Sequence, residues 1–504
     1  MLGIQMKSGM KGIAVGLLAC QALVVQWGCG GSERRTGVTP PHNLVVIVSD
    51  ALRRDVLGCY GGSARTPHID RLAREGTLFE NAYSTAPCTL PSSVAMLTGN
   101  YSRTYSYYIR REIPGKNKAL PWKQYCFYVP DAEWLLAESL VAAGWMARAA
   151  IGNSVVERSN ILQGFTRFPK KGREWRKRAG DSLKRMGVSL EKVNHRQEFL
   201  MLEFLWSVSR SQRFFLLHWI LDPHAPYASL PQRGEDLSGM ERTLPHPPEF
   251  YASLREHEMQ KLYRAGSLSD AEMNYIRRRY RAEVESVDER VGMILEILES
   301  RKLLADTLIV FTSDHGELLG GHGFIGHGRS FYQELVRVPL IFRGPGVERG
   351  RRVFSRVSHL DLTPTLADLC HAPVGDRMGG SYSHLFRVED EGVPLVYFDA
   401  VSNSLDPKWA GWDAILGGKY KLVVNRKAQE IQKVLYNLQE DPGEMVDRAA
   451  DFFQRVDELS RQIARLRATI RTRLEHNASR LREKLDLNNE ARKARETLKS
   501  LGYL

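Results

Sequence analysis

The chain has 504 residues, of which 43% are hydrophobic, so it can build a large core and is neither a disordered protein nor a polytopic membrane protein. Its net charge of +13 suggests an anionic partner, such as nucleic acid or a membrane surface. The charge is local, however. Residues 170–185 carry a net +6, residues 452–504 another +6 and residues 1–28 a further +2, which leaves −1 for the rest. Neither large basic segment matches a nucleic-acid-binding motif, and we predict no nucleic acid partner.

The first residues of the chain are typical of an export signal. Lys7 and Lys11 precede an apolar run over residues 13–25, which is short for a membrane span. Cys29 then opens a Gly-rich polar stretch like that of a bacterial lipoprotein, with residues 17–20 as an alternative match. We expect residues 1–28 to be a signal peptide or N-terminal anchor. The protein would then be periplasmic, or a membrane-anchored lipoprotein in a bacterium.

The six cysteines form no CxxC pair and no Cys/His spacing that would indicate a metal site. Export would permit disulfides, but the wide spacing indicates no disulfide framework. We therefore expect the cysteines outside the signal region to be free or buried thiols.

Apolar runs and helical patterns alternate along the chain. Four runs are typical of buried parallel strands that end at a polar residue: residues 43–49 before Asp50, 214–221 before Asp222, 307–313 before Asp314, and 338–342 before Arg343. Helical patterns lie between such runs, for example over residues 66–76 and 273–300. This alternation predicts an α/β fold with a mostly parallel sheet.

Polar residues that could bind a ligand follow three of these strands. In open α/β sheets, ligands bind at the carboxyl ends of the strands, where Asp50, Asp222 with His224, and Asp314 with His315 are expected. A single aspartate there is usually a helix cap, but three such ends with two nearby histidines indicate a site. Carboxylate and imidazole together suit zinc or manganese, whereas calcium prefers oxygen ligands. We expect one divalent metal ion (Mn, Zn or Ca), with its identity left open.

Two further segments complete the candidate site. Glycines surround His322 and His327 after Asp314, and we expect His322 to be an ordinary hydrogen-bonded loop residue. Pro91 and Gly99 predict a short helix over residues 91–98, with Thr89 at its N-terminus. Backbone N–H groups at such a terminus favour an anionic group, and a metal could activate the Thr89 hydroxyl as a nucleophile.

Together these segments resemble the sulfatase family of the alkaline phosphatase superfamily. The resemblance is carried, in family order, by residues 48–61 with 66–73, 89–93 with 97–99, 222–227, 313–340, and 435–444. It implies an alkaline-phosphatase-like, mostly parallel sheet flanked by helices, with a smaller C-terminal α+β subdomain and a helical tail. We predict a catalytic domain over residues 40–385, a C-terminal subdomain over 386–450 and a basic helical tail over 451–504.

The resemblance also implies roles for individual residues. Asp50, Thr89, Asp314 and His315 resemble the metal ligands, and Thr89 stands where the family places its nucleophile. His224 resembles the histidine near the leaving oxygen, which could act as a general acid. His327 stands where many sulfatases have a lysine that binds the oxyanion of the substrate.

The chain departs from the usual sulfatase pattern at several positions. Sulfatases convert the Cys or Ser of a C/S-x-P-x-R motif to formylglycine, but here Thr89 and Ser93 occupy the nucleophile and arginine positions, and Cys88 is out of register. Ala51 replaces a second aspartate. Residues 152–155 stand where many sulfatases read G-K-W-H, so the lysine and histidine of that motif are missing.

These departures favour phosphorus over sulfur chemistry. A formylglycine hydrate can expel sulfate, whereas a threonine sulfate has no such route; a threonine phosphate can be resolved by water. We therefore predict an exported, metal-dependent hydrolase of phosphate or phosphonate esters, such as a phosphodiesterase, acting on a small-molecule or envelope-derived ester. The alternatives are a true sulfatase (sulfuric ester hydrolase) and a non-catalytic envelope binding protein. A membrane transferase is less favoured because the sequence has no multi-span segment.

The basic tail is predicted to be helical. Leu459, Ile463, Leu466, Ile470 and Leu474 repeat at intervals of three and four residues, which places them on one helix face. The helix could have a simple solvated face, pack on the body, pair with a partner or lie near anionic lipid. Membrane-surface association, by a lipid anchor or by this tail, is therefore possible.

Overall fold

The structure is a computed structural model that describes residues 40–107, 126–127, 129–131, 133–169, 175–188, 193, 196–228, 237–388, 395–399, 411–426 and 431–486. The predicted signal segment, Cys29 and the last residues of the basic tail lie outside the described residues.

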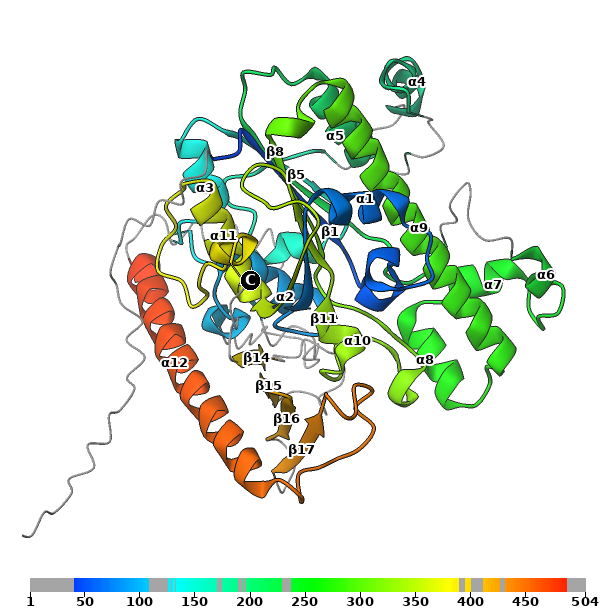
Figure 1. The fold of residues 1–504 in the computed structure, drawn as a ribbon, viewed down its shortest axis with the longest axis vertical. Coiled ribbons are helices and arrows are strands. Elements are labelled where there is room, and N and C mark those ends of the chain that lie inside the picture. The colour runs from blue at the N-terminus through cyan, green and yellow to red at the C-terminus, as the bar shows by residue number, and fades with distance from the viewer. Residues whose placement is uncertain are drawn as a thin grey trace, which may run out of the picture. The chain divides into compact units, whose positions relative to one another are not determined.

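A nine-stranded sheet forms the centre of the fold (Figure 1). Its strands are β1 (Asn43–Ser49), β2 (Thr77–Tyr83), β5 (Met146–Ile151), β6 (Thr166–Arg167), β7 (Phe214–Ile220), β8 (Thr307–Ser313), β11 (Arg337–Val338), β12 (Leu340–Arg343) and β13 (Arg351–Ser358). The order is β11-β2-β12-β8-β1-β7-β5-β6, with β13 paired to β2. The run β8-β1-β7-β5-β6 is parallel throughout, so the predicted mostly parallel sheet is confirmed.

One predicted strand runs the other way. Residues 338–342 were expected to form a parallel strand, but β12 is antiparallel to both β8 and β2. A parallel connection needs a long crossover, usually a helix. Between β8 and β12 the chain instead forms short elements, among them α10 (Gln333–Val336). The prediction also missed β2, since Glu80 and Asn81 interrupt its apolar pattern.

Helices cover both faces of the sheet (Figure 1). One face packs against α1 (Pro67–Glu75), α4 (Trp175–Met186), α5 (Arg196–Ser207) and α9 (Asp270–Ser300), and the other against α2 (Thr89–Thr98), α3 (Leu136–Ala142) and α11 (Leu362–Leu369). Strand β1 shows why both faces are buried. Val45 and Ile47 join the first cluster and Val46 and Val48 the second, because successive side chains of a strand point to opposite faces.

Shorter elements connect these layers. They are β3 (Ser106–Tyr107), β4 (Cys126–Phe127), α6 (Ser238–Glu241), α7 (Pro248–Ser253), α8 (Glu256–Arg264), β9 (Leu318–Leu319) and β10 (Ile325–Gly326). Short 3-10 turns span Arg54–Val56, Gly58–Tyr60, Ser102–Tyr105, Val156–Ser159, Leu304–Asp306, Gly321–Gly323, His359–Asp361 and Ser383–Phe386.

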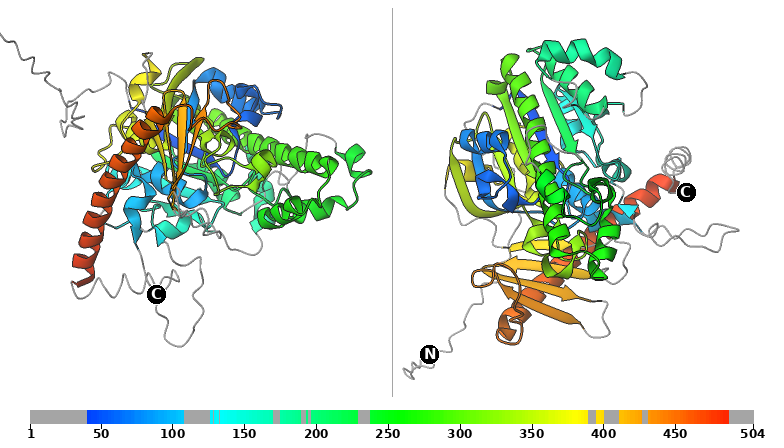
Figure 2. Two further views of the ribbon diagram at one scale, coloured as in Figure 1. Left: turned by 90° about the horizontal axis from the view of Figure 1, so that it is seen from below. Right: turned by 90° about the vertical axis from the view of Figure 1, so that its right-hand side faces the viewer.

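A second, antiparallel sheet follows the central one in the chain. It consists of β14 (Leu395–Asp399), β15 (Trp412–Gly417), β16 (Tyr420–Asn425) and β17 (Gln432–Asn437) in sequential order. The helix α12 (Phe453–Asp486) lies along this sheet (Figure 2). The fold class, with a small C-terminal subdomain and a helical tail, is thus confirmed, while the exact domain boundaries stay predictions.

The tail helix packs through its predicted apolar face. Leu459, Ile463 and Ile470 are fully buried and share a cluster with Ile415 and Leu422 of the sheet. The helix is therefore a structural part of the fold, and the exposed arginines lie on its other sides.

Further along, α12 contacts the segment that follows α2. Arg473 donates to the side-chain oxygen of Asn100 at 2.9 Å, and Asn477 donates to the carbonyl of Thr104 at 3.1 Å. The helix thereby joins the small sheet to the end of the helix that begins at Thr89.

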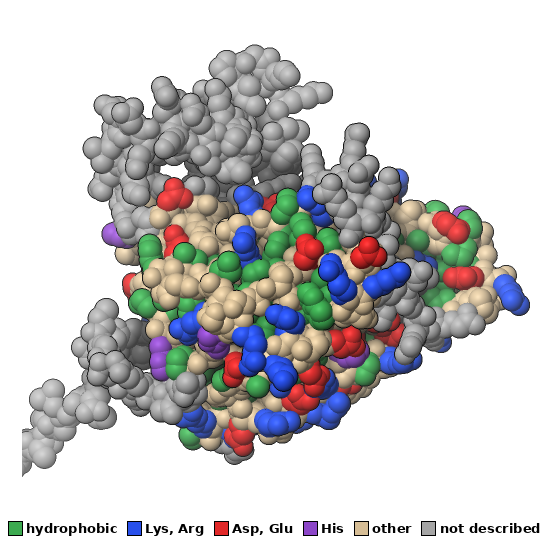
Figure 3. Space-filling model, turned by 90° about the horizontal axis from the view of Figure 1, so that it is seen from above, with side chains coloured by type: hydrophobic (Ala, Val, Ile, Leu, Met, Phe, Trp, Pro, Cys, Tyr) green, Lys and Arg blue, Asp and Glu red, His purple; other side chains and the backbone are tan. Residues whose placement is uncertain are grey.

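The described surface carries mixed charge. On the face shown in Figure 3, Lys and Arg side chains are interspersed with Asp and Glu side chains. The part of the basic segment 170–185 that the structure describes belongs to α4, whose buried Ala179 and Leu183 join the core. Among the described helices, none combines the length and apolar character needed to cross a membrane. Cys59, Cys88 and Cys370 are free thiols.

A buried ion pair connects the small sheet to the loop before α10. The Lys421 ammonium pairs with Glu444 and donates to the carbonyl of Phe331 at 2.5 Å. Glu444 in turn accepts a hydrogen bond from the backbone N–H of Gln333 at 2.6 Å. Both charged side chains are fully buried, so each depends on the other for its charge compensation.

Replacing Lys421 by Met should therefore destabilise the protein strongly. The change leaves the Glu444 carboxylate buried without its partner, which typically costs about 3–5 kcal/mol. The matched control is Lys419→Met, which removes an exposed pair with Glu440 (3.7 Å) and should change stability by about 1 kcal/mol or less. Urea unfolding followed by circular dichroism measures both variants. Equal midpoints for the two would contradict this assignment.

Candidate functional site

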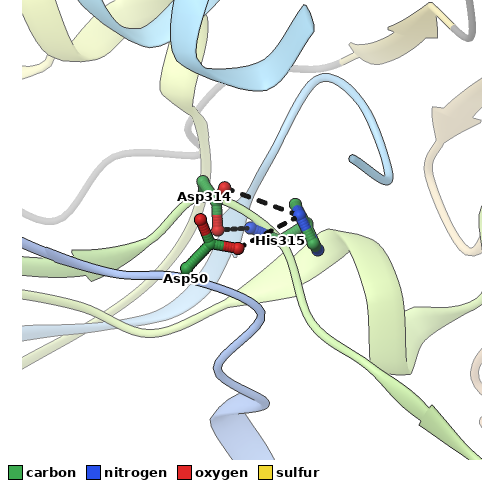
Figure 4. Close-up of side chains that lie close together, drawn as sticks. All are labelled: Asp50, Asp314 and His315. Atoms are coloured by element: carbon green, nitrogen blue, oxygen red, sulfur yellow. Dashed lines mark hydrogen bonds and ion pairs between the residues drawn. The ribbon is translucent and has the colours of Figure 1, made fainter. Parts of the chain in front are cut away.

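Two neighbouring strands bring the predicted metal ligands together. Ser49 of β1 lies opposite Ser313 of β8 in parallel register, so Asp50 and Asp314 leave the sheet side by side. One ligand atom from each of Asp50, Asp314 and His315 lies within 4.8 Å of the other two (Figure 4). All three residues are fully buried.

Asp314 presents one free carboxylate oxygen to the site. Its Oδ1 accepts from the backbone N–H groups of Ala51 at 3.1 Å and His315 at 2.9 Å. Its Oδ2 has no hydrogen-bond partner among the residues that the structure describes. Burial, followed by the charge of Asp50, raises the pKa of Asp314 well above its usual range. A buried carboxylate oxygen without a hydrogen-bond partner is well placed to bind a cation.

The backbone fixes the tautomer of His315. Its Nδ1 lies 2.8 Å from the carbonyl of Gly316, and a carbonyl can only accept, so Nδ1 carries the proton and Nε2 the lone pair. Burial, followed by the positive charge of His327, lowers the pKa of His315 well below its usual value. The neutral ring thus offers Nε2, which lies 3.5 Å from Asp314 Oδ2.

Position 316 must be glycine for this arrangement. A Cβ there would lie 1.8 Å from the carbonyl oxygen of Glu334, and the Gly316 N–H donates to the carbonyl of Leu335 at 2.8 Å. The close approach of these two segments holds the backbone next to His315 in place.

Thr89 lies against the same cluster. It is the first residue of α2, and its hydroxyl oxygen lies 3.2 Å from His315 Nε2 and 3.5 Å from Asp50 Oδ1. Cys88 precedes the helix and gives it no side-chain cap. Burial raises the pKa of the Cys88 thiol to about 12, so this neighbour stays protonated. Ser93 bonds back to the carbonyl of Leu90 within the helix.

His327 is held between two carboxylates. Its Nδ1 lies 3.0 Å from Glu317 Oε1 and 3.6 Å from Glu256 Oε2. Burial opposes its charge, but these carboxylates outweigh burial and raise the pKa of His327 to about 10, so the ring is an imidazolium at neutral pH. Its ring centroid lies 4.4 Å from that of His315 and 5.1 Å from that of His224.

His224 follows β7 on an anchored loop. The Asp222 carbonyl accepts from Ser49 Oγ at 2.7 Å, and the Asp222 carboxylate pairs with the buried Arg290 of α9. His224 Nδ1 lies 2.7 Å from the Ala225 carbonyl, so that nitrogen is protonated and Nε2 is left for other partners.

The structure thus brings together all six predicted residues, whereas His322 lies elsewhere. The His322 ring stacks on Tyr332 at 3.5 Å between centroids and lies 3.6 Å from Glu334, as expected of a loop residue.

Four neighbours of the site escaped prediction. Asn153 and Trp219 both donate to Asp50, and Glu256 and Glu317 both contact His327. Asn153 could have been found, because β5 ends two residues before it at the same edge of the sheet. Glu256 comes from α8, in a segment whose sequence gives no indication of this contact.

This geometry combines the parts of an ester hydrolase. Carboxylate and imidazole atoms converge on a place for a divalent cation, a hydroxyl lies beside it at a helix N-terminus, and two more histidines lie within reach.

Comparisons with known proteins agree with this arrangement. Residues 42–372 match the family model "Sulfatase", and residues 320–469 match "N-sulphoglucosamine sulphohydrolase, C-terminal". The uncharacterized sulfatase YidJ of Escherichia coli (strain K12) is 26% identical over 423 residues, covering 80% of this chain and 82% of that protein. The choline-sulfatase of Rhizobium meliloti (strain 1021) is 25% identical over 450 residues, covering 82% and 83%.

Solved structures share the fold. The phosphonate monoester hydrolase of Agrobacterium radiobacter gives a TM-score of 0.64 at 20% identity, covering 86% of this chain and 96% of that chain. BT4656, solved in complex with D-glucosamine-2-N,6-O-disulfate, gives 0.62 at 20% identity, covering 86% and 99%. With a family match over well more than half of its length, the chain belongs to the sulfatase family and is a sulfatase-like ester hydrolase of the alkaline phosphatase superfamily.

Proposed function

We propose that this protein is a metal-dependent hydrolase of phosphate or phosphonate esters whose nucleophile is Thr89. The observation that carries the proposal is the Thr89 hydroxyl, which lies against Asp50 and His315 where formylglycine would stand in the usual sulfatases. The proposal includes export, directed by residues 1–28, and membrane association through a lipidated Cys29 or the basic tail.

The side chains fit a divalent cation. Among the residues that the structure describes, the buried Asp314 Oδ2 has no hydrogen-bond partner, and Asp50 Oδ1 has only the long hydrogen bond from Thr89. His315 Nε2 carries a lone pair. Asp50, Asp314, His315 and Thr89 would hold the ion. Their mixture of oxygen and nitrogen suits zinc or manganese better than calcium. When bound, the ion would lower the pKa of the Thr89 hydroxyl and polarise the ester oxygens.

The anionic group of the substrate would be held from two sides. Cys88 leaves the N-terminus of α2 without a side-chain cap, so backbone N–H groups at Thr89 and Leu90 remain for an oxyanion. The His327 imidazolium supplies positive charge near the same place. His327 would thus take the part played by lysine in many sulfatases.

The reaction then follows from the positions of the side chains. The Thr89 hydroxyl gives its proton to solvent water and its oxygen attacks phosphorus. The bond from phosphorus to the leaving oxygen breaks, and His224 gives that oxygen a proton. Water next attacks the phosphorus of the threonine ester and gives one proton to His224. The bond from phosphorus to the Thr89 oxygen breaks, which releases the phosphate or phosphonate, and the Thr89 oxygen takes a proton from solvent.

The competing function is sulfate ester hydrolysis, which the names of the curated relatives favour. We favour phosphorus because threonine cannot form the aldehyde hydrate through which a formylglycine enzyme releases sulfate. Two of the proteins that share the fold are phosphonate monoester hydrolases, whose names describe action on phosphorus esters.

Thr89→Ala should abolish turnover, and Thr89→Ser should retain part of it, because only a hydroxyl at this position can attack. The measurement is hydrolysis of 4-nitrophenyl esters of phosphate, methyl phosphate, phenylphosphonate and sulfate by metal-loaded protein. Ser93→Ala is the control, since its hydroxyl faces the Leu90 carbonyl and its loss should leave activity intact. Activity in Thr89→Ala would refute the nucleophile, and faster turnover of the sulfate ester would favour the sulfatase alternative.

His224→Ala should slow poor leaving groups selectively. A general acid contributes about 10²–10⁴-fold when the leaving oxygen needs a proton, and little when it does not. We expect kcat/KM to fall in that range for an alkyl phosphonate ester but only slightly for its 4-nitrophenyl counterpart. The control is His322→Ala, which changes a loop histidine outside the site and should alter neither rate. An equal loss on both esters would contradict the role of His224.

Metal binding should stabilise the protein, and Asp314→Asn should remove this response. A ligand present at 1,000 times its Kd adds about 4 kcal/mol of stability. Thermal unfolding of wild type with chelator and with Zn²⁺ or Mn²⁺ should therefore give a higher Tm with metal, but Asp314→Asn should not respond. The control, Asp306→Asn, changes an exposed aspartate at the other end of β8 and should respond like wild type. A wild-type Tm that is the same with metal and with chelator would contradict the metal site.

A further inference from the structure

One carboxylate oxygen of Asp50 is fully occupied by side-chain donors. Its Oδ2 accepts from Asn153 Nδ2 at 2.7 Å and from Trp219 Nε1 at 3.1 Å. Trp219 is completely buried and Asn153 is nearly so, hence both bonds are shielded from water. Only Oδ1 of Asp50 faces Thr89 and His315.

The two donors are held rigidly. Trp219 pairs with Val48 on one side and Ile151 on the other, in the middle of the parallel sheet. The N–H of Gly152 donates to the Trp219 carbonyl at 2.8 Å, which places Asn153 just beyond the last pair of β5 and β7.

The amide of Asn153 can have only one orientation. Its oxygen accepts from the Val155 N–H at 2.9 Å, so its NH₂ group must face Asp50. Where many sulfatases carry a lysine for the oxyanion of the substrate, this residue therefore binds a carboxylate of the site.

Asp314 is restricted in the same way, by the backbone. Its Oδ1 accepts hydrogen bonds from the N–H groups of Ala51 and His315, and its Oδ2 has no hydrogen-bond partner among the described residues. Each carboxylate can then give a cation one oxygen. With His315 Nε2 and Thr89 Oγ1, the site offers four single donor atoms.

We propose that Asn153 and Trp219 are positioning residues that keep Asp50 from binding through both oxygens and so select a four-coordinate cation such as Zn²⁺ over Ca²⁺. Zinc is satisfied by four ligands that include nitrogen, whereas calcium takes six to eight oxygens and often uses a carboxylate through both of its oxygens. The inference rests on the metal site of the proposed function, but it concerns which ion the site accepts.

The test uses Trp219→Phe and Asn153→Ser in the full chain. Phenylalanine removes the indole N–H, and serine cannot reach Asp50 but can still accept from the Val155 N–H. Zn²⁺ and Ca²⁺ are titrated into metal-free protein in competition with a chromophoric chelator. Loss of such a supporting bond costs roughly 10–100-fold in metal affinity. We expect a Zn²⁺ loss of this size in each variant, a smaller change for Ca²⁺, and the lowest Zn²⁺/Ca²⁺ ratio in the double variant.

Matched controls separate positioning from packing. Trp145→Phe alters another buried tryptophan, just before the first residue of β5, and Ser154→Ala alters the exposed neighbour of Asn153. Both controls should bind the two ions like wild type. Thermal unfolding of the metal-free variants shows how much stability Trp219→Phe loses through altered packing, in comparison with Trp145→Phe.

The outcomes are distinct. Unchanged affinities in Trp219→Phe and Asn153→Ser, or equal losses for both ions, would overturn the inference while the proposed hydrolysis stands. A wild-type protein that binds neither ion would overturn the inference together with the metal dependence. Faster hydrolysis of sulfate than of phosphorus esters would overturn only the proposed substrate.

Discussion

Two carboxylates, Asp50 and Asp314, lie fully buried beside one another, and the rest of the site is organised around this constraint. Like charges in a dry interior are costly unless a cation or strong hydrogen bonds offset them. The hydrogen bonds satisfy one oxygen of each carboxylate, and the second oxygens point to a common place. Ala51 has a positive φ of 57°, which is unusual for alanine. In this conformation the Ala51 N–H donates a hydrogen bond to Asp314.

Support for this place extends into the small C-terminal sheet. Lys421 neutralises Glu444, Glu444 holds the N–H of Gln333 at the start of α10, and α10 ends against the backbone of Gly316. A chain of buried polar contacts thus runs from the second sheet to the residue after His315. This continuity agrees with the two family matches, which overlap and together span both sheets.

Much of the site could be predicted from the sequence. The apolar runs before Asp50 and Asp314 indicate buried strands, and the two aspartates mark the carboxyl ends of those strands. The antiparallel direction of β12 could not be predicted in this way, because a strand has the same apolar content in either direction. Only the short connection between β8 and β12 determines the direction. Strand β2 was hidden by Glu80 and Asn81, which lie where the sheet is less buried. Trp219 and Glu256 contact the site residues through long-range packing, for which local patterns hold no information.

The tail helix also bears on how the protein is made. Arg473 lies 373 residues after its partner Asn100, so the segment behind the Thr89 helix gains this contact only after residue 473 has been synthesised. Such distant pairings slow folding, because a long loop must close before the contact forms. The contact between α12 and the end of the Thr89 helix is therefore expected to form after the local contacts of that helix.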